Sequence, residues 1–376
     1  MKKLLRILML FLTLTSALGG VALGQNITGP VRGVTFFYLD GVAQDFPWVL
    51  ANQSDPTVRA KIDNLLAGYR AAGVNWIRLL IAADHFPAAN YPQPTQALIN
   101  QVNDFMAITR AGPNAGRFTV EVVFVTKRFA NGYFADYPPY TNDKMWLAEW
   151  ITKLNYSNLG MILITGDASP CAWEGTAARY SCYGDSATAI SPLAYNHGHW
   201  IATMWPWLKA NWPTLNASYE VIAGDPYNNG ELIKKLAQWV TMRTPDVPCM
   251  AASLYFELPP GSPWTAYANQ TVALLNAYAS VTAKPLWIDE YGMRVCAAVG
   301  CTYTESDQQA YYGGFLGSTT CWTSVKYPKF AWVAGNDYPY VGTFWYGLAS
   351  GFSSNQPVWR PAWGTVSLYY NLTACP

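Results

Sequence analysis

The stretch AKPLWIDEYGMR, residues Ala283 to Arg294, decides how the rest of this sequence is interpreted. A Lys-Pro pair precedes the apolar run Leu286–Ile288, which predicts a short buried strand, and Asp289 and Glu290 follow at its end. Two adjacent carboxylates are costly to desolvate, so their position at a strand end indicates a chemical role. In a parallel α/β barrel the carboxyl ends of the strands form the active face. Glu290 is therefore the first candidate catalytic residue.

The residues that follow Glu290 strengthen this interpretation. An apolar strand that ends in Glu, followed by the aromatic Tyr291 and then Gly292, resembles the nucleophile strand of the retaining glycoside hydrolases of clan A. The similarity is to cellulase- and mannanase-like enzymes of the family 5 type. It implies an α/β fold, the (β/α)8 TIM barrel, with Glu290 as nucleophile. The alternative is a solvated loop acid beside a turn glycine.

A single arginine, Arg78, interrupts the apolar run 76–81. Desolvating an unpaired guanidinium is prohibitive, so Arg78 predicts either a buried anionic partner or a route to solvent. The pattern G-x-N-x-x-R from Gly73 to Arg78 resembles the second strand of clan A enzymes. The resemblance implies that Arg78 lies beside Glu290 and keeps it ionised; a structural ion pair is the alternative.

The second carboxyl group is the point at which the sequence departs from the family. A retaining glycosidase needs two carboxyl groups about 5 Å apart, and in clan A the general acid ends strand four in the motif Gly-Asn-Glu-Pro. Here residues 166–170 read GDASP, which puts Asp167 on the Asn position and Ala168 on the Glu position. Three residues are candidates for the missing role: Asp167 itself, Glu174 in the following loop, and Glu257 after strand six.

Three further positions match the family pattern. The resemblance implies that Tyr255, at the end of strand six, hydrogen-bonds the nucleophile, and that Trp332 on strand eight forms the floor of the sugar site. Asp337, which follows strand eight, also resembles the last part of these enzymes. Ordinary core packing is the alternative for each position.

Strands and helices alternate along the chain, and no low-complexity linker divides it. We expect one barrel domain with loop insertions over residues 25–376. Apolar runs predict strands at 31–38, 76–81, 118–126, 161–165, 219–225, 249–256, 286–288 and 330–334, and helices at 55–72, 94–110, 142–154 and 230–240.

Residues 1–24 predict a signal peptide, with basic residues before an apolar run and a small-residue cleavage site. The mature protein is therefore expected to be secreted, with no membrane segment beyond the signal. All seven cysteines follow this segment and predict disulfide bonds, with one thiol left over or paired between chains. Loop proximity favours the pairs Cys171–Cys182 and Cys296–Cys301.

The composition favours a neutral sugar as ligand. Charged residues are 12% of the chain and the net charge is +1, which gives no attraction for nucleic acid. The 17 Trp and 25 Tyr residues offer flat faces on which sugar rings stack. No G-x-S-x-G elbow is present, and His197 and His199 are expected at a helix start rather than on a metal.

The sequence thus predicts a secreted, monomeric retaining glycoside hydrolase that acts on a β-linked polysaccharide or oligosaccharide of the β-glucan or β-mannan type, without metal or cofactor. Two alternatives share the barrel. Ala168 favours a catalytically impaired glycan-binding or surface protein, and a transglycosylase would use the same site with different access for water.

Overall fold

A computed structural model of the chain describes fourteen segments that span most of residues 31–372. The predicted signal peptide and at least one cysteine of each predicted disulfide lie outside them. The described residues are 31–36, 38–40, 44–82, 93–125, 140–165, 192–223, 237–254, 263–282, 284–293, 295–296, 303–319, 330–333, 344–345 and 347–372.

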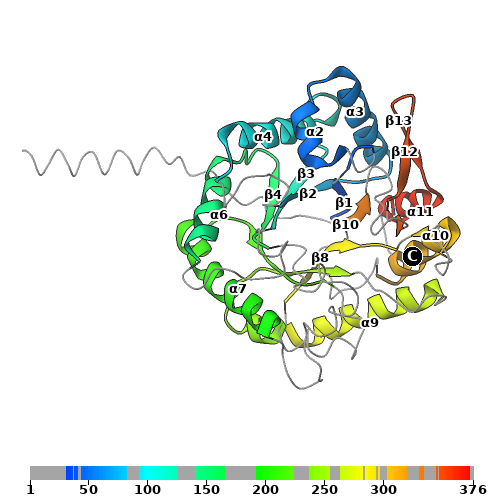
Figure 1. Ribbon diagram of the computed structural model, residues 1–376. Coiled ribbons are helices and arrows are strands. Elements are labelled where there is room, and N and C mark those ends of the chain that lie inside the picture. Colours follow the sequence, from blue (N-terminus) through cyan, green and yellow to red (C-terminus); the bar gives the residue numbers. More distant parts are fainter. Residues whose placement is uncertain are drawn as a thin grey trace, which may run out of the picture.

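One parallel sheet lies at the centre of the molecule (Figure 1). Its strands are hydrogen-bonded in the order β5-β4-β3-β2-β1-β10-β8-β7-β6. The strand bounds are β1 (Gly33–Phe36), β2 (Trp76–Ala82), β3 (Thr119–Val125), β4 (Leu159–Leu163), β5 (Ala217–Ser218), β6 (Glu220–Ala223), β7 (Met250–Leu254), β8 (Leu286–Tyr291) and β10 (Phe330–Val333).

The two edges of this sheet, β5 and β6, are consecutive pieces of one strand that is interrupted only at Tyr219. On one side, Ile164 N–H donates to the Ser218 carbonyl at 3.0 Å. On the other side, Ala251 N–H donates to the Tyr219 carbonyl at 3.0 Å. The segment 217–223 therefore connects β4 to β7, and the described strands follow one another around a ring. The predicted (β/α)8 barrel is confirmed.

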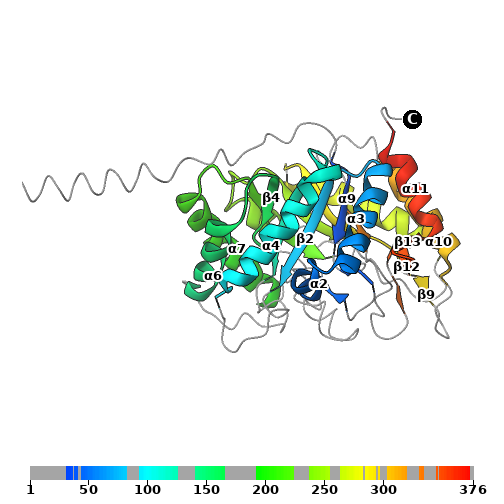
Figure 2. The same ribbon diagram turned by 90° about the horizontal axis from the view of Figure 1, so that it is seen from above.

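Helices surround the strands, and α3 and α4 run alongside β2 (Figure 2). Such an outer layer covers apolar side chains on the strands' outward faces. The helix bounds are α2 (Phe46–Asn52), α3 (Pro56–Ala71), α4 (Gln96–Arg110), the 3-10 helix η2 (Gly112–Asn114), α6 (Thr141–Lys153), α7 (Pro192–Asn211), α9 (Trp264–Thr282), α10 (Glu305–Thr319) and α11 (Pro361–Tyr370).

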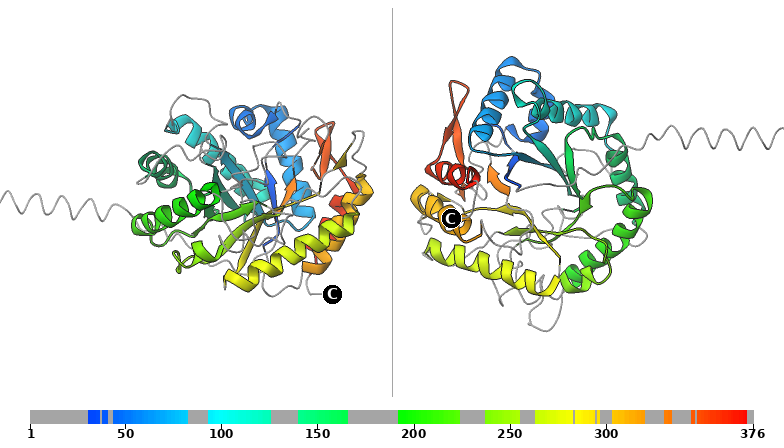
Figure 3. Two further views of the ribbon diagram at one scale, coloured as in Figure 1. Left: turned by 60° about the horizontal axis from the view of Figure 1, so that its bottom comes forward. Right: turned by 180° about the vertical axis from the view of Figure 1, so that it is seen from behind.

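Two antiparallel strand pairs accompany the barrel. β9 (Val295–Cys296) pairs with β11 (Phe344–Trp345), and β12 (Ala349–Ser353) pairs with β13 (Gln356–Trp359). The β12–β13 hairpin stands outside the helix ring beside α3 and α11 (Figure 3). The rings of Trp359 and Trp363 stack there with centroids 4.4 Å apart.

The local sequence explains how the repeat begins. The Asp55 side chain caps α3 by accepting hydrogen bonds from the N–H groups of Thr57 and Val58, at 2.9 and 3.0 Å. Pro56 occupies the first helical turn, where its missing N–H costs nothing. Gly73, with φ of 79°, ends the helix and returns the chain toward β2. The helix predicted from Asp55 is therefore present.

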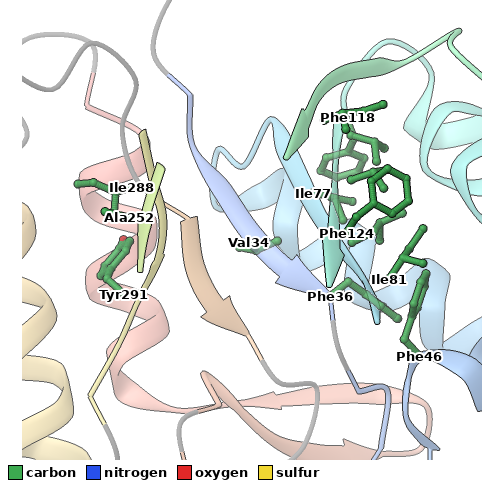
Figure 4. Packing of buried hydrophobic residues seen from close by; sticks show 14 of the residues in the cluster. Val34, Phe36, Phe46, Ile77, Ile81, Phe118, Phe124, Ala252, Ile288 and Tyr291 are labelled. Carbon is green, nitrogen blue, oxygen red and sulfur yellow. The ribbon is translucent and has the colours of Figure 1, made fainter. Parts of the chain in front are cut away.

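Buried side chains form two clusters, one on each side of the ring. The outer cluster fills the space between strands and helices, and Figure 4 shows Ile288 and Tyr291 within it. The inner cluster fills the interior of the barrel. Its members are Val31, Trp76, Leu80, Val123, Val125, Met161, Leu163, Cys249, Ala251 and Trp287.

Gly160 allows β4 to approach its neighbours, and this predicts a stability effect. A Cβ at this position would collide with the Thr119 side chain and the Trp76 ring. We expect Gly160→Ala to lower the free energy of unfolding by about 1–3 kcal/mol in urea titrations. Gly364 in α11 is the control, because a Cβ there meets nothing within 4 Å. Gly364→Ala is expected to stabilise by about 0.5–1 kcal/mol, and equal effects would contradict this assignment.

Buried tyrosines predict a loss of stability at alkaline pH. Burial raises the pKa of Tyr69 and Tyr219 well above the ordinary tyrosine value, and Tyr291 is affected in the same way. A raised folded-state pKa gives stability that is complete below about pH 10 and is lost as the pH rises further. At about pH 11, each such tyrosine is expected to lower the free energy of unfolding by about 1.4 kcal/mol.

Tyr69→Phe tests this expectation. The Tyr69 hydroxyl makes no hydrogen bond with any described residue, so its removal costs little at neutral pH. Urea unfolding at about pH 8 and about pH 11 should show a smaller alkaline loss in the variant than in the wild type. The same alkaline loss in both proteins would show that Tyr69 does not contribute.

Candidate active site

The inner and outer faces of β8 are defined by its first three residues. Leu286 and Ile288 belong to the outer cluster, whereas Trp287 belongs to the inner cluster. Successive side chains of a strand point to opposite faces. Strict alternation would therefore turn Glu290 outward, on the same face as Ile288 and toward the helices.

A register shift between β7 and β8 changes this alternation. Ala252 pairs with Ile288, and the next residue, Ser253, pairs with Glu290. Asp289 is therefore an extra residue in β8, and such irregularities redirect the side chain that follows. Glu290 consequently faces the interior at the carboxyl end of β8, the end at which barrel enzymes carry their active sites.

The structure brings Glu290 and Arg78 together inside the barrel. Nη1 of Arg78 contacts Oε1 of Glu290, and both side chains are buried. Arg78 projects from β2 and Glu290 from β8, so the contact joins residues 212 positions apart in the sequence. A guanidinium in contact with a carboxylate stabilises the charged form of that carboxylate.

A second carboxylate, Glu121 on β3, lies on another side of the same guanidinium. Its Oε1 is 3.8 Å from Nε of Arg78, and both side chains are fully buried. Its Oε2 accepts a hydrogen bond of 2.9 Å from the indole nitrogen of Trp287 on β8. The Trp287 ring in turn contacts Trp76 edge-on, with centroids 5.3 Å apart. Arg78 is thus shared between acids from two strands.

The sheet register aligns these residues across neighbouring strands. Thr35 on β1 pairs with Arg78 on one side and with Trp332 on the other, and Arg78 pairs with Glu121. The backbones of Trp332 on β10 and Arg78 on β2 are therefore separated by one strand, β1. The Trp332 side chain lies outside what the structure describes.

A third buried acid, Glu220, begins β6. Its neighbours Tyr219 and Val221 belong to the outer cluster, so Glu220 faces the interior of the ring. Its backbone pairs with Ala251 of the inner cluster. Carboxyl groups from β3, β6 and β8 therefore enter the barrel interior.

The sequence prediction did not include Glu121 or Glu220. Glu121 shows the same signal that identified Arg78, a single charge within the apolar strand TVEVVFV. Glu220 stands similarly at the start of EVIA. The remaining predicted site residues, Asp167, Glu174, Tyr255, Glu257 and Asp337, lie outside the described residues.

In the described segments no group of three His, Cys, Asp or Glu residues is arranged so that it could hold a metal ion. His197 and His199 lie inside α7, which begins at Pro192, so the prediction that they stand at a helix start is wrong. The His199 ring packs against Trp239 with centroids 5.2 Å apart. None of the helices in the described part combines the length and apolarity required to cross a membrane.

Comparison with solved structures identifies the class of fold. A glycoside hydrolase of subfamily GH5_18 from Streptomyces cattleya, in complex with Manb1-4GlcNAc, has a TM-score of 0.61 and 12% identity. The match covers 93% of this chain and 83% of that one. Xylanase 10B from Thermotoga maritima has a TM-score of 0.55 and 10% identity, covering 90% of this chain and 94% of that one.

A β-glucuronidase from Faecalibacterium prausnitzii has a TM-score of 0.56 and 15% identity over 92% of this chain. The match covers 49% of the glucuronidase, so this chain spans about half of its length. No protein-family model and no curated protein sequence matches the chain. At 10–15% identity these matches show that the chain shares the (β/α)8 barrel fold of these structures.

Proposed function

We propose that this protein is an exported, retaining glycoside hydrolase that acts on a β-linked polysaccharide of the β-glucan or β-mannan type. The observation that carries the proposal is the buried contact between Glu290 and Arg78 at the carboxyl end of β8. A carboxylate held ionised inside a barrel mouth is suited to attack an electrophilic carbon.

The proposed reaction has two steps. One Glu290 oxygen attacks the anomeric carbon, the bond to the leaving oxygen breaks, and a general acid supplies that oxygen with a proton. Water then attacks the glycosyl-enzyme ester, gives a proton to the same acid residue, and releases Glu290 as a carboxylate. Arg78 stabilises the anion that begins and ends each turnover.

Asp167 is the proposed general acid, and Glu174 and Glu257 are the alternatives. β4 ends at Leu163, four residues before Asp167. Since β4 and β8 are parallel strands of one ring, their carboxyl ends lie at the same mouth of the barrel. A carboxyl group that follows β4 therefore starts from the same side of the molecule as Glu290.

The substrate class rests on composition and fold. Few charges and many aromatic rings suit a neutral sugar chain. The disaccharide in the GH5_18 structure has a β-linkage, as its name states. Export rests on the N-terminal segment 1–24 alone.

A second candidate function is a glycan-binding protein on the same barrel. It is favoured by Ala168, which occupies the position of the family's general acid. Without a proton donor, the site would hold a sugar next to Glu290 but cleave it inefficiently.

The test is hydrolysis of soluble β-glucans, β-mannans and β-galactans, with the anomeric form of the first product followed by NMR. The proposal expects cleavage with retention, and azide rescue of Asp167→Asn if that residue is the acid and base. Glu149→Gln, on the surface of α6, is the control for an unrelated carboxylate. Inversion would overturn the proposed mechanism, and binding without cleavage would favour the second function.

A further inference from the structure

Arg78 contacts both Glu290 and Glu121, and its side chain is fully buried. Removing a guanidinium from water is costly unless a carboxylate neutralises it. In the resting site two carboxylates do so, one from β8 and one from β3. Of these two ion pairs, the one with Glu290 is interrupted during the proposed reaction.

The interruption follows from the chemistry of the first step. When Glu290 bonds to the anomeric carbon, its negative charge passes to the leaving oxygen, which takes a proton from the general acid. Glu290 is then a neutral ester until water hydrolyses it. During that interval Arg78 keeps its charge, because a guanidinium does not lose its proton in proteins.

Glu121 is placed to neutralise Arg78 in that interval. It faces the guanidinium from β3, and its other oxygen is fixed by the Trp287 indole at 2.9 Å. Trp287 precedes Glu290 by three residues on the same strand. β8 therefore positions both acids that contact Arg78: it carries Glu290, and its Trp287 donates a hydrogen bond to Glu121. Glu121 is fully buried, next to Arg78 in the register and four residues before the carboxyl end of β3.

We propose that Glu121 is a positioning residue that holds Arg78 in place and neutralises it whenever Glu290 is uncharged. The catalytic part of this inference rests on the proposed function, whereas the sharing of Arg78 between two carboxylates does not. The two parts are therefore tested separately.

The sharing of Arg78 is tested by urea unfolding of Glu121→Gln, Glu290→Gln and the double variant. Each glutamine keeps the shape of the side chain but removes its charge. Each single variant leaves one carboxylate on Arg78, whereas the double variant leaves neither. The proposal expects the double variant to lose more stability than the sum of the two single losses. Additive losses would overturn it.

Arg78→Met in the double-variant background keeps the test decisive if the double variant folds poorly. Methionine fills a similar length without a charge, so it should restore stability if the loss of both carboxylates from Arg78 is the cause. Failure of Arg78→Met to restore stability would overturn the proposal. Glu149→Gln, which removes a partly exposed carboxylate paired with Lys153, is the control and should have little effect.

The catalytic part is tested with an activated aryl β-glycoside, for which hydrolysis of the glycosyl-enzyme limits kcat. In Glu121→Gln we expect kcat/KM to fall about tenfold or more, because forming the ester leaves Arg78 without either carboxylate. Hydrolysis of the ester returns the Glu290 carboxylate to Arg78, so kcat should change less than kcat/KM, and KM should rise. A fall in kcat with unchanged KM would indicate fewer folded molecules and overturn this part. A wild type without activity would refute the proposed function, while the unfolding test still decides the sharing of Arg78.

Discussion

Glu290→Gln is expected to abolish hydrolysis, with a fall in kcat of about 10⁴-fold or more. The amide keeps the size of the side chain and an oxygen that accepts from Arg78, but it is not a nucleophile. Arg78 also keeps the carboxylate of Glu121. The variant should therefore fold like the wild type, which circular dichroism and urea unfolding would measure alongside the rate.

The control for this variant is Glu149→Gln on α6, where the carboxylate pairs with Lys153 at the surface. Its activity should equal that of the wild type. If Glu290→Gln kept more than about a tenth of the wild-type rate, Glu290 could not be the nucleophile.

Arg78→Met is expected to lower the free energy of unfolding by about 3–5 kcal/mol, because it leaves Glu290 and Glu121 buried without their shared cation. The loss should be smaller when the pH is lowered, since protonation of each acid removes one of the two uncompensated charges. Urea unfolding at two pH values measures both effects.

Arg59→Met is the matched control for this change. Arg59 pairs with Asp63 on the exposed face of α3, at 3.1 Å. Removing such a surface pair is expected to change stability by less than about 1 kcal/mol. Similar losses for Arg59→Met and Arg78→Met would contradict the interpretation of Arg78 as a buried, shared cation.

The barrel was predictable because its strands and caps are locally encoded. The apolar runs predicted strands near all eight positions, and Asp55 marked the start of α3 correctly. The fifth strand begins at Ala217, two residues earlier than predicted. Its first residues contribute through backbone pairing with β4, which the local apolar pattern does not reveal.

The site was predictable only in part. A lone arginine in an apolar strand required a partner, and the family resemblance suggested Glu290. The direction of Glu290 was not predictable, because alternation from Trp287 places it on the wrong face. Only the pairing of β8 with β7 shows that Asp289 is an extra residue. Glu121 is also a single charge in an apolar strand, so it too requires a buried partner.

The proposed mechanism requires that Glu290 forms a covalent bond with the sugar. The direct measurement is incubation with 2-deoxy-2-fluoro β-glycosyl fluorides of glucose, mannose, galactose and xylose, followed by mass spectrometry of proteolytic peptides. These reagents trap the glycosyl-enzyme because the fluorine slows its hydrolysis. We expect one added sugar on the peptide that contains Glu290, and none in Glu290→Gln. A sugar bound to a different acid would contradict the role of Glu290 as nucleophile. Hydrolysis with inversion and no adduct would contradict it as well.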